Sequence, residues 1–376
     1  MIYFDNNATT EIAEDVVEAM LPFLKGNFGN PSSAHAGGND VRCAIGEARN
    51  SVAELLGASP DDIFFPSGGT ESDNWAIRSA LAAGETRNRI VTSKVEHEAV
   101  RKTCEQLETV GAEVIWLDVD SDGSLDLGQL RDSVDEHTAL VSIMWANNET
   151  GVVFPVAEIA EIVKGRSNAL VHVDAVNAAG KLSIDLAKTS IDLLSISAHK
   201  FHGPKGVGAL YIRRGVNLPA MMIGGGQEAG RRAGTEAVHQ IVGLGAAARS
   251  VADLAPMAAV ENLRDKLESS ILATIPCASV NGTRAVEHRL PNTSYISFEN
   301  INGEMLLSAL DDRSVCVSTG SACNSETHTA SPVLAAMNIP YSQAMGSIRF
   351  SLGRLNTESE VDRVLRILPE LVSRLR

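Results

Sequence analysis

The segment Ser195 to Gly206 has the sequence SISAHKFHGPKG and lies between two short apolar runs, residues 191–194 and 207–212. Each apolar run predicts a buried β-strand, so the polar segment marks the end of one strand and the turn that leads to the next. Lys200 stands at this strand end, and lysine forms Schiff bases with carbonyl cofactors once its amine is neutral. A surface lysine in a β-hairpin would explain this segment equally well, so a second observation is needed.

A carboxylate upstream supplies that observation. Asp174 follows the apolar run 169–173, which predicts another strand, and it precedes Lys200 in the chain. An acid at the end of a parallel strand can keep the ring nitrogen of pyridoxal phosphate protonated, so that the ring takes up electrons. Asp174 could also be a loop acid that caps a helix. Together, Asp174 and Lys200 favour a pyridoxal phosphate site.

Size and charge limit the class of protein. The 376 residues are enough for one large and one smaller domain with a sizeable core. The formal net charge of −15 argues against a direct nucleic-acid interface and against an anionic membrane surface. No apolar stretch approaches the roughly 20 residues of a membrane-spanning helix. The first five residues lack a signal-like pattern, so we expect a cytoplasmic protein.

The five cysteines are odd in number and show no metal-ligand spacing, so no metal site is predicted: Cys43, Cys104, Cys277, Cys316 and Cys323. In a reducing compartment most are expected to be free thiols. Cys323 lies in the small-residue run STGSACNS, which is typical of an accessible thiol, whereas Cys316 lies on the apolar strand expected before it. Cys323 is therefore the candidate nucleophile, with a purely structural cysteine as the alternative.

A glycine-rich turn predicts a phosphate site. Residues 67–72, SGGTES, follow a short apolar strand at 62–66 and open a helix. A helix N-terminus offers backbone N–H groups and a favourable dipole to an anion. Gly69 and Thr70 are the candidate phosphate ligands, Thr70 through its hydroxyl. Many strand-to-helix turns carry glycine, so an ordinary turn is the alternative.

Polar residues that follow other predicted strands extend the candidate site, because such residues mark the ligand crevice of an α/β sheet. His97 follows the strand 89–93; it could move protons near neutral pH, cap the next helix or lie at the surface. Asn148 follows the strand 139–144, where a simple turn is the alternative. Arg349 alternates with apolar neighbours and should point into a cleft, where a guanidinium suits a carboxylate, unless it forms an edge-strand salt bridge.

These motifs, in this order, resemble the cysteine desulfurases of the nitrogen-fixation and iron–sulfur housekeeping type. Those enzymes belong to the class V aminotransferase family of fold type I pyridoxal phosphate enzymes. The resemblance covers essentially the whole chain and is carried by residues 5–10, 30–33, 67–72, 96–97, 147–151, 172–174, 197–200, 234–235, 321–323 and Arg349. It implies an α/β fold whose large domain, residues 13–255, contains a mainly parallel seven-stranded sheet between helices. Residues 1–12 and 256–376 would form a smaller α+β domain that carries the cysteine loop and the substrate arginine.

The resemblance also implies the conversion of L-cysteine to L-alanine with pyridoxal 5′-phosphate. Lys200 would bind the cofactor and move the substrate's α-proton, His97 would stack on the cofactor ring, and Cys323 would take the sulfur as a persulfide. Arg349 would hold the substrate carboxylate, with Asn148 near it and near the phenolic oxygen of the cofactor. The implied phosphate ligands are Gly69, Thr70, Ser197, His199 and, from the neighbouring subunit, Thr235.

Asn177 departs from the family pattern, which places glutamine there beside the phenolic oxygen. Asparagine keeps the amide but is one methylene shorter. The resemblance therefore does not carry this contact over to Asn177, although it still implies the cofactor. The resemblance further implies a homodimer with a shared active site, and a sulfur-acceptor protein such as an iron–sulfur scaffold. No membrane partner is expected.

Three alternatives stay open at this point. A transaminase or selenocysteine lyase of the same family would need Lys200 and Asp174 but no loop cysteine, so Cys323 distinguishes it from a desulfurase. The second alternative is a cofactor-binding relative that has lost activity and serves as a scaffold. The third is an unrelated α/β binding protein without a cofactor.

Overall fold

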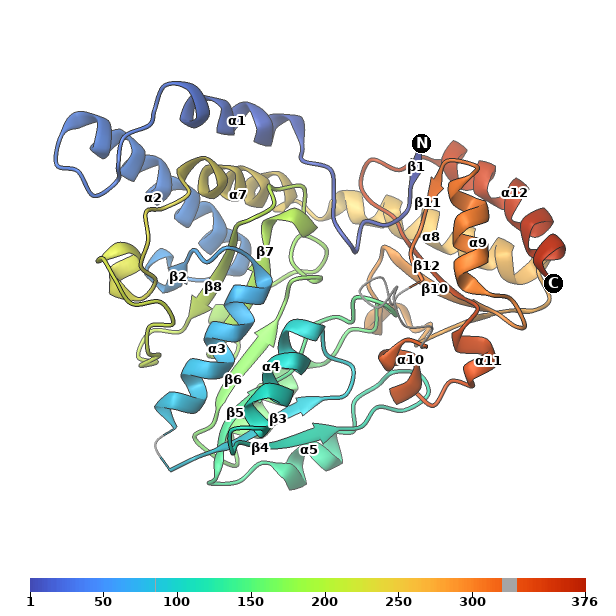
Figure 1. Ribbon diagram of the computed structural model, residues 1–376, viewed down its shortest axis with the longest axis horizontal. Helices are drawn as coiled ribbons and strands as arrows, with labels where there is room; N and C mark the ends of the chain where they lie inside the picture. The colour runs from blue at the N-terminus through green and yellow to red at the C-terminus, as the bar shows by residue number, and fades with distance from the viewer. Residues whose placement is uncertain (85, 320–329) are drawn as a thin grey trace.

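The computed structural model describes residues 1–84, 86–319 and 330–376. Figure 1 shows a large body built around one sheet and a smaller body that contains both termini. The large sheet has seven strands, mostly parallel, with helices on both faces, and the smaller body combines helices with short antiparallel strands. The predicted fold class is therefore confirmed.

The large sheet has the strand order β2-β8-β7-β6-β5-β3-β4. Its strands are β2 (Ile63–Phe64), β3 (Arg89–Ser93), β4 (Glu113–Leu117), β5 (Thr138–Ser142), β6 (Leu170–Asp174), β7 (Leu193–Ser197) and β8 (Gly208–Ile212). The strands from β4 to β7 in this order run parallel, whereas β8 is antiparallel to β7 and β2 is antiparallel to β8. The central strands are rich in apolar residues because helices bury both faces of the sheet.

Helices cover the two faces of this sheet. The helices of one face contribute to the largest hydrophobic core: α2 (Ala36–Leu56), α5 (Leu127–Ser133), α6 (Val156–Lys164) and α7 (Val238–Val251). On the other face, α3 (Gly69–Ala83) and α4 (Glu98–Glu108) pack in a second core around Trp75. Because α4 follows β3 directly, its N-terminus lies at the edge where the parallel strands end.

A third hydrophobic core combines both ends of the chain, since Ile2 and Phe4 pack with residues between Met257 and Val372. The strand β1 (Ile2–Tyr3) pairs in parallel with β11 (Val315–Cys316). An antiparallel sheet is formed by β9 (Ala278–Val280), β10 (Thr293–Phe298) and β12 (Ser347–Ser351). The helices of this part are α8 (Ala255–Thr274), α9 (Gly303–Asp311), α10 (Pro332–Ala336), α11 (Tyr341–Ala344) and α12 (Glu358–Leu375). No single helix among the described residues has the length and apolarity to cross a membrane; only the bent pair of α7 and α8, counted together, reaches them.

The first helix differs from its prediction. The apolar pattern predicts a helix over residues 11–24 with one buried face, but α1 spans Glu14–Lys25 and buries only Val16. The later start follows from backbone hydrogen bonds that hold the preceding segment extended, because Ala13 N–H donates to the carbonyl of His202 at 3.0 Å. Other apolar side chains of this helix are exposed, Leu24 by 57%.

Candidate functional site

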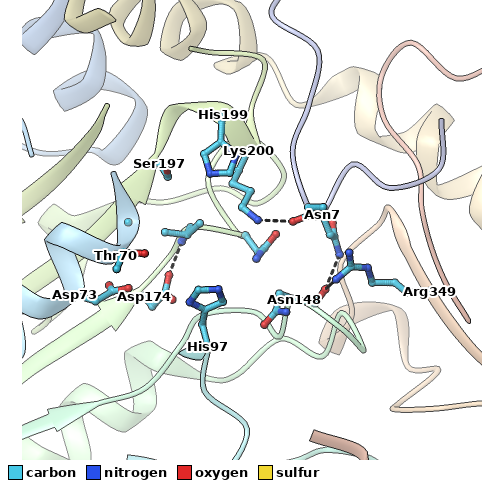
Figure 2. A pocket seen from close by; sticks show the side chains of 14 residues that line it. Asn7, Thr70, Asp73, His97, Asn148, Asp174, Ser197, His199, Lys200 and Arg349 are labelled. Atoms are coloured by element: carbon cyan, nitrogen blue, oxygen red, sulfur yellow. Dashed lines mark hydrogen bonds between the residues drawn. The ribbon is translucent and has the colours of Figure 1, made fainter. Parts of the chain in front are cut away.

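A cavity of about 290 Å³ lies where the large sheet meets the smaller body (Figure 2). Ten predicted site residues line it: Gly69, Thr70, His97, Asn148, Asp174, Asn177, Ser197, His199, Lys200 and Arg349. Its wall also contains residues that the sequence did not single out for this role: Asn7, Ala8, Asp73 and Val176. The structure thus brings together side chains that are up to 342 residues apart, from Asn7 to Arg349.

Lys200 enters the cavity from the end of β7. It closes the short 3₁₀ helix η3 (Ala198–Lys200), and its Nζ donates a hydrogen bond to the backbone carbonyl of Asn7 at 2.5 Å. The chain turns back sharply after it, and a Cβ on Gly203 would lie 2.7 Å from the Cβ of Ala198. This tight turn fixes the direction of the lysine, which Figure 2 shows reaching into the cavity.

Asp174 occupies the end of the neighbouring strand β6. Its Oδ1 accepts a hydrogen bond from Val176 N–H at 2.9 Å, which holds the carboxyl in place. Burial raises the pKa of Asp174, and the hydrogen bond from Val176 N–H and the nearby charge of Lys200 offset part of that rise. A cationic N–H group placed against this carboxyl would stabilise its ionised form, as the protonated ring nitrogen of pyridoxal phosphate does.

His97 caps a helix and lines the cavity at the same time. As the N-cap of α4, its Nδ1 accepts a hydrogen bond from Ala99 N–H at 3.1 Å. Burial lowers the pKa of His97, and the charge of Lys200 acts in the same direction. The ring is therefore neutral near pH 7 with its proton on Nε2. The capping interpretation is right, and it is compatible with a role in the cavity.

The N-terminus of α3 fits a phosphate group. Gly68 precedes the helix at φ +152° and offers no side-chain cap, so the first backbone N–H groups are available to an anion. A Cβ on Gly69 would lie 2.7 Å from Cγ2 of Val176, so the backbone comes close to the cavity wall. The hydroxyl-bearing Thr70 and Ser197 line the same cavity, which suits a dianion that needs several donors.

Arg349 reaches the cavity from β12 in the smaller body. Its Nη1 donates to the backbone carbonyl of Asn148 at 2.8 Å, and its Nη2 donates to Oδ1 of Asp5 at 2.7 Å. The Nε atom is buried and has no hydrogen-bond partner among the described residues. A planar guanidinium with a remaining donor suits a carboxylate ligand. The edge-strand salt bridge considered for this residue is also present, with Asp5.

The amide of Asn177 and the ring of His199 complete the wall near Lys200. Oδ1 of Asn177 is buried without a hydrogen-bond partner among the described residues, so it has acceptor capacity for a ligand. Nδ1 of His199 lies 3.2 Å from Oγ1 of Thr9. Burial and the charge of Lys200 lower the pKa of His199 to about 4, so this ring is neutral at physiological pH.

Thr235 and Cys323, the other two predicted site residues, have different outcomes. Thr235 is exposed and does not line it. Cys323 lies outside the described residues, so its predicted role stays a prediction. Of the residues that the sequence did not assign to the site, Asn7 belongs to the motif at residues 5–10. Asp73 follows Gly69 by about one helical turn, and that spacing could have placed it on the cavity side of α3.

Comparisons with known proteins match this sequence over nearly its whole length. The family model described as Aminotransferase class-V matches residues 2–364. A cysteine desulfurase of Nostoc sp. strain PCC 7120 is 51% identical over 378 residues, covering 100% of this chain and 94% of that protein. Cysteine desulfurase NifS of Azotobacter vinelandii is 48% identical over 378 residues, covering 100% and 93%. A solved NifS-like protein has a TM-score of 0.93 and 42% identity, with 100% of both chains covered. The matched range of the family model includes every residue that lines the cavity.

Proposed function

The chain belongs to the class-V aminotransferase family, and we propose that it is a cysteine desulfurase that converts L-cysteine to L-alanine. The observation that carries the proposal is the convergence of Lys200, Asp174 and His97 in one cavity with Arg349 opposite them. The cofactor is pyridoxal 5′-phosphate. When bound, it supplies an aldehyde that condenses with amines and a ring that takes up electrons from the substrate's α-carbon.

The chain's residues divide the binding of this cofactor among them. Asp174 would stabilise the protonated ring nitrogen, and Lys200 would supply the amine for the aldehyde. His97 would lie against the ring, where its neutral imidazole adds no charge. The N-terminus of α3 and the side chains near it, including those of Thr70, Ser197 and His199, would bind the phosphate. Asn177 and Asn148 would lie near the phenolic oxygen, to which their side-chain amides would donate.

Two residues of the cavity would act on the substrate itself. Arg349 would bind the α-carboxylate, and its hydrogen bond to Asn148 places the guanidinium beside that residue. Lys200, as a neutral amine, would take the proton from the α-carbon of the substrate. Removal of water from the cavity would strengthen the ion pair of Arg349 with the carboxylate, because few water dipoles remain to screen it.

Sulfur transfer is assigned to Cys323. Its thiolate attacks the sulfur of L-cysteine, an S–S bond forms, and the C–S bond of the substrate breaks. The electron pair of that bond stays on the β-carbon, which takes up the proton that the Cys323 thiol lost on ionising, and the carbon skeleton leaves as L-alanine. The persulfide on Cys323 then passes its sulfur to an acceptor protein such as an iron–sulfur scaffold.

A homodimer would complete the site. Phe28 and Ile223 are 90% and 92% exposed, and Leu24 on α1 is also exposed, so the chain presents apolar side chains that a partner would bury. Thr235 is exposed in the single chain and follows the loop that contains Ile223. In a dimer its hydroxyl would bind the phosphate in the neighbouring subunit.

The domain division follows from the cores. We assign residues 13–255 to the large domain, and residues 1–12 and 256–376 to the small domain, because Ile2 and Phe4 pack in the core formed by residues 257–372. Leu290, Val333 and Leu334 nevertheless pack with the large core and tie the two domains together. A cytoplasmic location is consistent with the free thiols of Cys43, Cys104, Cys277 and Cys316.

The decisive experiment is the intact mass of the protein after brief incubation with L-cysteine in the absence of reductant. Wild type should gain about 32 Da, the mass of one sulfur atom, and Cys323→Ser should not. Cys43→Ser is the matched control because it removes an exposed thiol elsewhere, and it should behave as wild type. A gain in Cys323→Ser would refute the nucleophile assignment, and no gain in wild type with cofactor bound would favour a transaminase or lyase.

A further inference from the structure

Asp73 is a carboxyl in the cavity wall to which the proposed function gives no task. It belongs to α3, it has no exposed surface, and it lines the cavity together with Asp174. Neither of its carboxyl oxygens has a hydrogen-bond partner among the described residues. An ionised carboxylate buried without a partner is strongly unfavourable, so Asp73 is either neutral or partnered by something the cavity binds.

Asp73 lies over the face of β6 that carries His172 and Asp174. Its Oδ1 is 3.5 Å from Nε2 of His172, and side chains two residues apart on a strand point to the same side. Both nitrogens of His172 are already engaged, with Ser142 Oγ at 2.8 Å and Ser195 Oγ at 2.9 Å. Burial lowers the pKa of His172 to about 3, so the ring is neutral and gives Asp73 no countercharge.

The two carboxyls of the cavity differ in their surroundings. Asp174 accepts a hydrogen bond from Val176 N–H and has Lys200 nearby, and both offset part of the effect of its burial. No backbone N–H of the described residues donates to Asp73. Burial, followed by the charge of Asp174, raises the pKa of Asp73 well above the ordinary value, although the nearby Ser195 hydroxyl acts in the opposite direction. Two neighbouring buried carboxyls do not both ionise readily, so the negative charge belongs on Asp174 and the proton on Asp73.

We propose that Asp73, which Figure 2 shows beside Asp174, is a positioning residue that stays a neutral carboxylic acid and directs its proton toward Asp174, leaving Asp174 as the anion that would pair with the ring nitrogen of the cofactor. This inference rests on the proposed function, since it takes the role of Asp174 from there. A second anion at Asp73 would raise the pKa of Asp174, and a protonated Asp174 would no longer form an ion pair with the ring nitrogen. Glu96 is also buried, and its charge when ionised would raise the pKa of Asp73 further.

Infrared difference spectroscopy on the cofactor-loaded protein tests the protonation state. A protonated carboxylic acid has a C=O stretching band that is separate from the bands of carboxylates. The spectrum of wild type minus Asp73→Asn at neutral pH should contain this band, because the other buried acids, Glu96 and Glu149, are the same in both proteins and cancel. Absence of the band would overturn the proposal.

Cofactor affinity tests the positioning role. The amide in Asp73→Asn can donate a hydrogen bond as the acid does, so its Kd for pyridoxal phosphate should stay within about twofold of wild type. Asp73→Leu has no donor and should bind about tenfold more weakly, the expected loss of one hydrogen bond to a charged group. Ile77→Val, a buried change in α3 outside the cavity, controls for loss of packing.

Equal affinities in Asp73→Asn and Asp73→Leu would contradict the positioning role, because packing alone would then explain the position. Both measurements follow binding and protonation, so they do not depend on sulfur transfer. A protein that binds the cofactor but gains no sulfur on Cys323 would refute the desulfurase assignment and leave the role of Asp73 standing.

Discussion

Glu96 is fully buried beside the cavity, where its Oε1 accepts hydrogen bonds from Ser93 Oγ at 2.8 Å and from Met144 N–H at 3.0 Å. Burial raises its pKa from 4.5 to about 8. The folded chain therefore keeps a proton on Glu96 at pH values where the unfolded chain has lost it. The stabilising contribution of this proton is complete below about 4.5 and is lost as the pH rises to about 8.

We predict that Glu96→Gln flattens this pH dependence. Glutamine resembles the protonated acid and keeps the acceptor for both hydrogen bonds, so the free energy of unfolding should match wild type near pH 4.5. By about pH 8 the variant should be the more stable protein, by an amount on the order of a few kcal/mol. Urea unfolding at a series of pH values, with cofactor saturating in both proteins, measures the difference. A difference that does not change with pH would show that Glu96 is ionised in the folded chain.

The sequence could predict the site residues that stand at strand ends, because Lys200, Asp174 and Asn148 follow apolar runs whose direction in a parallel sheet is known. It could not predict that Lys200 would donate a hydrogen bond to the carbonyl of Asn7, because that contact depends on how the N-terminal segment packs against the large sheet. Asp73 was missed because a polar residue in the first turns of a helix is common and usually exposed.

At the scale of elements, the N-terminus of α3 depends on the absence of a side chain at Gly69. We predict that Gly69→Ala weakens pyridoxal phosphate binding by about tenfold, because the new Cβ would lie 2.7 Å from Cγ2 of Val176 and must displace the turn. The double variant Gly69→Ala with Val176→Ala removes the clash and should recover most of the affinity. Fluorescence titration of the cofactor-free protein measures both. Failure of the second change to restore binding would mean that the backbone conformation, not the contact, is at fault.

Elements with unbroken apolar patterns were predicted closely. The predicted strands 89–93, 169–173 and 207–212 agree with β3, β6 and β8 to within one residue at each end. The first helix was not, because its apolar face implies burial that the single chain does not provide. An apolar periodicity predicts that one face of a helix is buried, but it does not identify whether the same chain or a second chain buries it.

At the scale of the whole molecule, the exposed apolar side chains of Leu24, Phe28 and Ile223 lead to a prediction about assembly. Wild type should have twice the chain mass in analytical ultracentrifugation, and the double variant Phe28→Asp, Ile223→Asp should sediment as a single chain, because charges replace apolar side chains that a partner buries. Val110→Arg changes another exposed apolar residue, outside α1 and the loop before Thr235, and should leave the mass unchanged. A wild type that sediments as one chain would contradict the shared site and the role of Thr235.

The first ten residues have a consequence for the order in which the protein is completed during synthesis. They leave the ribosome long before their partners do, because β1 pairs with β11 at residues 315–316 and the carboxylate of Asp5 accepts a hydrogen bond from Arg349. The seven strands of the large sheet are all present once residue 212 has emerged, so the nascent chain contains Asp174 and Lys200 long before it contains the arginine for the substrate. Translation therefore delivers the cofactor half of the site first, and substrate binding arises only as the last strand of the small domain is added.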